Sequence, residues 1–330
     1  MTVINGIEID DIQYNKNLVK TAIMNNDPIE KKLNVIAVIS NPCLFAKRYI
    51  LMKEFINRIQ LEDDNVNLFI VELAYGDQRF LITDKKNPKH LQIRTKCPLW
   101  HKENMINLGV KYLLPKNYKA FAWIDADIEF DSPTWALDTL KLLNGSHDIV
   151  QLFSHCIDMD PSQMAMNVFN SAGFQFSKNK SHVSKGINYS HPGYAWAITR
   201  KAYERIGGLY ENSILGAGDH IMLLSLLGNG DKSINQNCSD DYKEDILQFQ
   251  RKIQTLRLGY VPGLIRHHYH GSKKNRKYQE RWQILVKHEY SPFKHLTKDE
   301  KGIIIPGPEF PEELKTDIYQ YFLERNEDEE

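Results

Sequence analysis

The stretch Ala120–Asp131, which reads AFAWIDADIEFD, decides the fold of this chain. Its first five residues are apolar and predict a buried β-strand over 120–124. Asp125 and Asp127 follow where that strand ends. Side chains two residues apart on extended backbone point to the same side, so we expect both carboxylates to face one ligand. One interpretation is a divalent-cation site, because hard cations prefer oxygen ligands; the other is a solvated strand end with turn aspartates.

The segments before this stretch alternate between apolar runs and helical patterns. We expect strands over 34–40 and 67–73, a helix over 44–59, a polar loop over 74–90 and a helix over 99–113. The order strand, helix, strand, helix, strand favours an α/β fold with a parallel sheet and right-handed crossovers. Ligands of such sheets bind beyond the carboxyl ends of the strands, which is where Asp125 and Asp127 fall.

The regular alternation ends after residue 150. Loops rich in Ser, Asn, Gly and His suggest a substrate-binding lobe, and later patterns predict helices over 221–227 and 242–258 and a strand over 260–266. We therefore divide the chain into an N-terminal arm (1–33), a first half (34–150), a second half (151–275) and a C-terminal extension (276–330).

The composition argues against several classes of protein. Lys plus Arg and Asp plus Glu both number 42, so the formal net charge is zero, which does not favour wholesale nucleic-acid binding. The four cysteines form no CxxC pair and indicate reduced thiols. The sequence has no run of 18 apolar residues and no signal-peptide pattern, so we expect a soluble, cytoplasmic protein without a membrane span.

Three further windows accompany the paired aspartates. The first is Leu99–Gly109, LWHKENMINLG; the second runs from Pro192 to His220 and ends in LGAGDH; the third is Leu264–His267. Together with the paired aspartates, these windows resemble the GT-A glycosyltransferases. The second window is similar to β-1,4-galactosyltransferases and polypeptide N-acetylgalactosaminyltransferases. The resemblance implies a Rossmann-like mixed sheet with helices on both faces and an acceptor-binding lobe.

The same resemblance implies an activity. A sugar would move from a nucleoside-diphosphate sugar, with a UDP-sugar favoured, to an acceptor hydroxyl, and Mn²⁺ or Mg²⁺ would stabilise the departing diphosphate. Residues 34–150 would bind the nucleotide sugar, and residues 151–275 would hold the acceptor and the catalytic group. The acceptor stays open among a glycan, a protein side chain and a modified DNA base.

For the metal, the resemblance implies that Asp127 binds it directly. His267 would be a further ligand through a neutral imidazole, with His270 as the alternative, although a histidine near a strand end is also compatible with a structural role. Asp125 would help to orient the metal and would hold ribose or sugar hydroxyls.

For the substrates, the resemblance implies that Asp219 is the general base and that the reaction inverts the anomeric configuration, although a helix cap is an alternative role. Lys102 would contact the diphosphate or sugar, and Glu72 the uracil or ribose. Gly193 would let a ligand approach the backbone closely. The related loops place an acidic pair after their glycines, whereas this chain has Asp219 followed by His220.

The basic segment Arg266–Arg281, RHHYHGSKKNRKYQER, has three interpretations. It would close over the diphosphate, contact the phosphates of a nucleic-acid acceptor, or form a solvated helix face. Competing functions for the chain are a zinc-dependent hydrolase using His267, His268 and His270, a metal-dependent nucleotidyltransferase, and a binding module without catalysis. The sequence has no HExxH pattern for the first and no Gly-rich phosphate loop after the first strand for the second.

Overall fold

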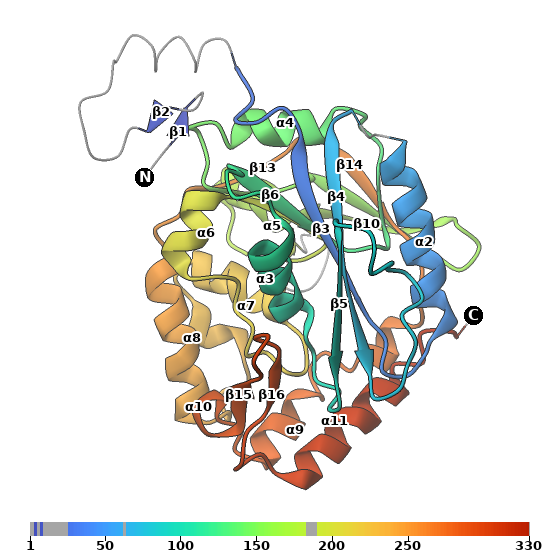
Figure 1. The fold of residues 1–330 in the computed structure, drawn as a ribbon. Coiled ribbons are helices and arrows are strands. Elements are labelled where there is room, and N and C mark those ends of the chain that lie inside the picture. The colour runs from blue at the N-terminus through green and yellow to red at the C-terminus, as the bar shows by residue number, and fades with distance from the viewer. Residues whose placement is uncertain (1–2, 5–6, 9–25, 62–63, 183–189, 330) are drawn as a thin grey trace.

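A seven-stranded mixed sheet forms the centre of the computed structural model, which describes residues 3–4, 7–8, 26–61, 64–182 and 190–329 (Figure 1). The strand order is β13-β8-β12-β6-β3-β4-β5. The strands are β3 (Leu33–Ser40), β4 (Val66–Tyr75), β5 (His90–Thr95), β6 (Ala120–Ile124), β8 (Ile149–Gln151), β12 (Ala195–Thr199) and β13 (Leu258–Tyr260). β3 is parallel to β4 and β6, as expected, whereas β12 is antiparallel to both β6 and β8.

A second, five-stranded sheet has the order β11-β10-β9-β14-β7. Its strands are β7 (Ile128–Phe130), β9 (His155–Met159), β10 (Ala165–Ser171), β11 (Ser190–His191) and β14 (Leu264–His267). β14 lies between β9 and β7, parallel to the first and antiparallel to the second. Because β6 ends at Ile124 and β7 begins at Ile128, the three residues between them form one of the turns that join the two sheets.

Helices cover both faces of the central sheet. The helices of the described residues are α2 (Ala46–Gln60), α3 (Lys102–Leu113), α4 (Trp135–Leu142), α5 (Ala172–Ser177), α6 (Arg200–Ile206), α7 (Gly218–Leu226), α8 (Asp240–Ile253), α9 (Trp282–Lys287), α10 (Pro292–His295) and α11 (Glu312–Glu324), with short 3₁₀ helices η1 (Gly230–Ser233) and η2 (Lys273–Arg276). Two-stranded pairs are β1 (Val3–Ile4) with β2 (Ile7–Glu8) and β15 (Leu296–Lys298) with β16 (Ile304–Pro306).

Alternate strand residues pack into two separate cores. Ile36 on β3 belongs to the core that includes Met105 and Leu108 of α3, whereas its neighbour Val35 belongs to the core that includes Phe55 of α2 and Trp135 of α4. This alternation follows from the two-residue period of a strand. The mixed α/β architecture with helices on both faces is therefore confirmed.

Several sequence predictions need correction. The strand expected over 260–266 is two strands, β13 and β14, which belong to different sheets. Pro262 and Gly263 separate them, and a proline cannot donate to a strand ladder. β5 and the short strands β8 to β10 were not predicted, and α8 ends at Ile253 rather than at 258. The strand over 120–124 is confirmed with its bounds.

The structure describes parts of both ends of the chain. Most of the expected arm (1–33) lies outside the described residues, but Ile29 is buried against the core and Leu33 already belongs to β3. The C-terminal segment beyond α11 returns to the central sheet beside α2 (Figure 1). Within the described part of the chain, every helix is too short or too polar to cross a bilayer.

Candidate functional site

A cavity of about 860 Å³ opens at the turn between β6 and β7. Residues from the ends of β3 and β14, from α2, α3 and α7, and from the C-terminal segment line it. Six residues predicted from the sequence lie on its wall: Lys102, Asp125, Asp127, Asp219, His267 and the alternative ligand His270. The fold therefore brings together side chains that are up to 168 positions apart in the sequence (102 to 270).

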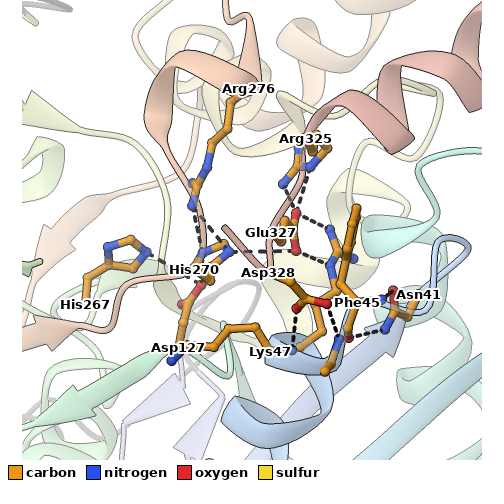
Figure 2. Close-up of polar contacts among 12 residues, drawn as sticks. Asn41, Phe45, Lys47, Asp127, His267, His270, Arg276, Arg325, Glu327 and Asp328 are labelled. Atoms are coloured by element: carbon orange, nitrogen blue, oxygen red, sulfur yellow. Dashed lines mark hydrogen bonds and ion pairs between the residues drawn. The ribbon is translucent and has the colours of Figure 1, made fainter. Parts of the chain in front are cut away.

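Asp127, His267 and His270 form a candidate metal centre in this cavity, with one ligand atom from each residue within 4.8 Å of the others. Asp127 Oδ2 lies 3.6 Å from His267 Nε2 and 2.8 Å from His270 Nε2 (Figure 2). Asp127 Oδ1 and His267 Nε2 are buried without a hydrogen-bond partner among the described residues. Because such atoms are costly to bury, a cation bound between them would stabilise the site.

The donor set restricts the choice of metal. One carboxylate and two imidazoles suit Fe²⁺ or Zn²⁺, and such a site binds Mn²⁺ less tightly than these two ions, whereas Mg²⁺ prefers oxygen ligands and keeps several waters. Of the two ions that the sequence resemblance implies, Mn²⁺ therefore fits these residues better than Mg²⁺.

A buried carboxylate, Asp158 on β9, lies behind His267. Its Oδ1 is 2.7 Å from His267 Nδ1, and Lys273 contacts its other oxygen. Burial opposes a charge on His267, but the carboxylates of Asp127 and Asp158 raise the pKa of its imidazole above the ordinary value. Burial likewise opposes the charge of Asp127, yet the two histidines hold its pKa well below the ordinary range. The carboxylates of Asp127 and Asp158 therefore favour a positive charge at this centre.

Asp125 lies outside this three-residue centre and pairs with Lys102 at the start of α3, with Nζ 2.5 Å from Oδ1. Burial raises the pKa of Asp125, and Lys102 opposes that rise. The premise that both aspartates lie on extended backbone does not hold, because Ala126 and Asp127 form a turn. The two carboxylates consequently have different partners.

Asp219 lies in the first turn of α7 and reaches the cavity wall. Ala217 is the N-cap residue of this helix, so Asp219 is not its cap; its Oδ1 accepts a hydrogen bond of 2.8 Å from the amide of His220. Burial opposes its charge, but Lys102 and His191 lower the pKa of the carboxyl below the ordinary value. Asp219 is therefore a charged carboxylate at neutral pH.

Gly193 lies directly behind Asp219, where a Cβ atom would meet Asp219 Oδ2 at 2.2 Å. The glycine makes room for a catalytic candidate, and the expected close approach of a ligand to its backbone stays a prediction. Glu72 lies elsewhere: it is buried, does not line the cavity, and accepts hydrogen bonds from the amides of Leu81, Ile82 and Thr83. Its carboxylate holds the 74–90 loop against β4.

Glu103 is a cavity residue that the sequence did not reveal. It follows Lys102 on α3, and burial raises the pKa of its carboxyl to about 7, with Lys102 acting in the opposite direction. A Cβ atom on Gly218 would meet Glu103 Oε1 at 2.4 Å, so the Gly-rich loop packs directly on this side chain. Only the packing of Gly218 on Glu103 distinguishes this residue from an ordinary helix glutamate, and that packing is set by the tertiary fold and not by the local sequence.

The basic segment 266–281 lines the cavity with Lys273, Arg276 and Arg281. Arg276 reaches down from η2, and its Nη2 donates to His270 Nε2 at 2.8 Å (Figure 2). His268 is not part of the centre, because its ring contacts Glu129 and Gln163. A three-histidine zinc site is therefore not assembled in this structure.

No protein-family model matches the sequence, and the search of curated proteins gives no match. Among solved structures, the chain is similar to a Drosophila β-1,4-galactosyltransferase 7 mutant in complex with manganese, UDP-Gal and xylobiose (12% identity, TM-score 0.40, 84% of this chain and 93% of that chain). It is also similar to a putative nucleotide-diphospho-sugar transferase from Desulfovibrio desulfuricans (8%, 0.32, 72% and 82%) and a putative glucose-1-phosphate thymidylyltransferase from Bacillus anthracis (7%, 0.35, 71% and 88%). These similarities, at low identity, are to nucleotide-sugar transferases and nucleotidyltransferases.

Proposed function

We propose that this chain is a metal-dependent glycosyltransferase that moves a sugar from a nucleoside-diphosphate sugar to an acceptor hydroxyl. The observation that supports it most is the convergence of Asp127, His267 and His270, with orphaned buried atoms, on the same cavity as Asp219. A cation centre and a charged carboxylate are the two groups that this transfer requires. The sequence resemblance to GT-A enzymes supports the same function.

The donor end of the cavity would hold the diphosphate. When bound by Asp127, His267 and His270, a divalent cation supplies Lewis-acid stabilisation of the leaving diphosphate. Arg276 lies against His270, has a buried Nε without a partner among the described residues, and would donate to a phosphate oxygen. Asp125 would accept from ribose or sugar hydroxyls, while Lys102 keeps that carboxylate in place and adds positive charge near the phosphates.

The acceptor end would be built on α7. Asp219 would take the proton of the attacking hydroxyl as the new bond to C1 forms and the bond from C1 to the diphosphate oxygen breaks. Attack from the side opposite the leaving group inverts the anomeric carbon, so the product anomer, read by NMR, tests this role. A UDP-sugar is the favoured donor, and the acceptor class is a glycan, a protein side chain or a modified nucleobase.

The test of the metal centre is the substitution Asp127→Ala. We expect it to abolish the Mn²⁺-dependent part of UDP binding in titration calorimetry, because the anionic ligand of the centre is lost. Asp131→Ala is the matched control, since Asp131 follows on the same segment but pairs with Arg266. UDP affinity that responds to Mn²⁺ equally in both variants would contradict the proposal. Asp219→Asn should keep donor binding and lose transfer.

The nucleotidyltransferase alternative is distinguished by its product. A nucleotidyltransferase releases pyrophosphate, whereas a glycosyltransferase releases the nucleoside diphosphate. The stretch from Ser40, the last residue of β3, to Pro42 has no glycine. The Asn41 side chain donates to the carbonyl of Phe45 through Nδ2 and accepts from the Phe45 amide through Oδ1. The geometry after this strand therefore does not favour a phosphate-binding loop.

A further inference from the structure

Glu327, near the C-terminal end of the chain, is buried in the wall of the cavity with 1% of its surface exposed. Its carboxylate accepts from Arg48 through both oxygens, with Nη2 at 2.7 Å, and from Arg325 Nε at 2.7 Å. Arg48 also donates to the carbonyl of Ser40 at the end of β3. Two guanidinium groups compensate the buried charge, so this carboxylate is held firmly in one place.

The neighbouring residues fix the path of this segment. The Asp328 carboxylate accepts from the amides of Ala46 and Lys47 at the start of α2, at 2.9 and 2.8 Å (Figure 2). On the other side, a Cβ atom on Gly271 would lie 2.9 Å from the backbone of Asn326 and Glu327. The C-terminal segment is thus packed between α2 and the loop that carries His270.

His270 lies between Glu327 and Asp127. Its Nδ1 is 3.8 Å from Glu327 Oε2, an ion-pair contact rather than a hydrogen bond, and its Nε2 is 2.8 Å from Asp127 Oδ2. Arg276 Nη2, which can only donate, also lies 2.8 Å from Nε2, whereas the Asp127 carboxylate can only accept, so these two contacts do not fix where a neutral ring carries its proton. A metal ion on Nε2 would leave the ring proton on Nδ1, on the side of Glu327.

His267 repeats this arrangement. Its Nδ1 contacts the buried carboxylate of Asp158 at 2.7 Å, and its Nε2 faces Asp127 without a hydrogen-bond partner among the described residues. Each histidine of the candidate centre therefore presents Nε2 to Asp127 and Nδ1 to a carboxylate with 1% exposure. Lys273 compensates the charge of Asp158, as the two arginines compensate that of Glu327.

We propose that Glu327 and Asp158 are positioning residues that hold His270 and His267 with their Nε2 lone pairs directed to one metal ion. The C-terminal segment is then a part of the metal centre. This inference rests on the proposed function, because it presumes that the centre binds a cation. A carboxylate behind a ligating imidazole fixes its tautomer and increases its basicity, and loss of such a carboxylate typically weakens metal binding about 10- to 100-fold.

The first readout is the tautomer of the His267 ring in the metal-free protein. In protein labelled with ¹⁵N-histidine, two-bond ¹H–¹⁵N spectra at pH 8 should show the proton of His267 on Nδ1. The Asp158→Asn substitution should shift this ring toward a mixture of tautomers. A wild-type His267 ring with its proton on Nε2 would overturn the role of Asp158.

The second readout is Mn²⁺ affinity, measured by electron paramagnetic resonance without any nucleotide sugar. Glu327→Gln and Asp158→Asn should each weaken Mn²⁺ binding about 10- to 100-fold. Glu329→Gln is the matched control, because Glu329 belongs to the same segment but contacts Asn275 outside the cavity. It should bind Mn²⁺ like the wild type.

A third variant separates positioning from folding. Glu327→Asp keeps the charge that Arg48 and Arg325 require but withdraws it from His270 by one methylene group, so it should fold and still lose Mn²⁺ affinity. Folded Glu327 variants with wild-type affinity would overturn this inference alone. A wild-type protein that binds no Mn²⁺ would overturn the proposed metal centre and this inference together.

Discussion

At the scale of single residues, two glycines are required by carboxyl groups rather than by turns. A Cβ atom would lie 2.2 Å from Asp219 Oδ2 at Gly193 and 2.4 Å from Glu103 Oε1 at Gly218. Neither glycine has a positive φ angle, so backbone conformation does not explain them. The missing side chains let two acidic groups lie beside Lys102 on one wall of the cavity.

Glu103 makes a pH-dependent contribution to stability. Its carboxyl pKa is raised by burial from 4.5 to about 7, so the folded protein keeps a proton that the unfolded chain releases within this range. Stability is therefore lost as pH rises through this window, by up to about 3 kcal/mol. Glu103→Gln should unfold at a higher temperature than the wild type at pH 8 and at a similar one at pH 4.5, in calorimetry with EDTA present. An equal difference at both pH values would contradict the raised pKa.

At the scale of elements, α2 depends on a residue from the opposite end of the chain. Its N-cap residue, Phe45, makes no side-chain cap, and the amides of Ala46 and Lys47 are satisfied by Asp328. Asp328→Ala leaves both amides without this partner and removes a negative charge from the positive end of the helix dipole. We expect a loss of about 1 kcal/mol in urea unfolding, with Glu329→Ala as the control. No difference between the two variants would contradict a capping role.

The segment between β14 and α9 shows that charge composition alone leaves the structure of an element open. Its charge pattern is compatible with a solvated helix face, yet η2 is a single 3₁₀ turn, and Arg276 and Arg281 line the cavity. Gly271, with a φ angle of +81°, turns the chain back over the C-terminal segment. The position of this turn, and not the number of basic residues, brings Arg276 to His270.

At the scale of the whole molecule, the cavity joins segments from β3 to the C-terminal residues, so its ligands should stabilise the entire fold. A ligand at 100 times its dissociation constant adds about 2.7 kcal/mol to the free energy of unfolding. We expect Mn²⁺ with UDP to raise the melting temperature more than either alone, because the diphosphate and His270 would share the ion. If Asp127→Ala shows the same combined rise, the two ligands do not meet at this centre.

The sequence by itself determined the strand over 120–124, the acids that follow it, the α/β order of the first half, and the windows that contain Asp219 and His267. These features are local, because apolar periodicity and turn residues act over a few positions. Glu72 lies on a predicted strand, but the sequence does not indicate that the amides of Leu81 to Thr83, in the following loop, donate hydrogen bonds to its carboxylate.

Only the tertiary structure decided which side chains meet. Asp158 reaches His267 because β9 pairs with β14 across 109 positions, and Glu327 reaches His270 because the C-terminal segment packs between α2 and Gly271. Glu103 became notable only when Gly218 was placed on it. Short-range preferences do not encode such contacts. The order of the strands, the turns between the two sheets and the return of the chain end place these side chains together, and burial and charge compensation stabilise the arrangement.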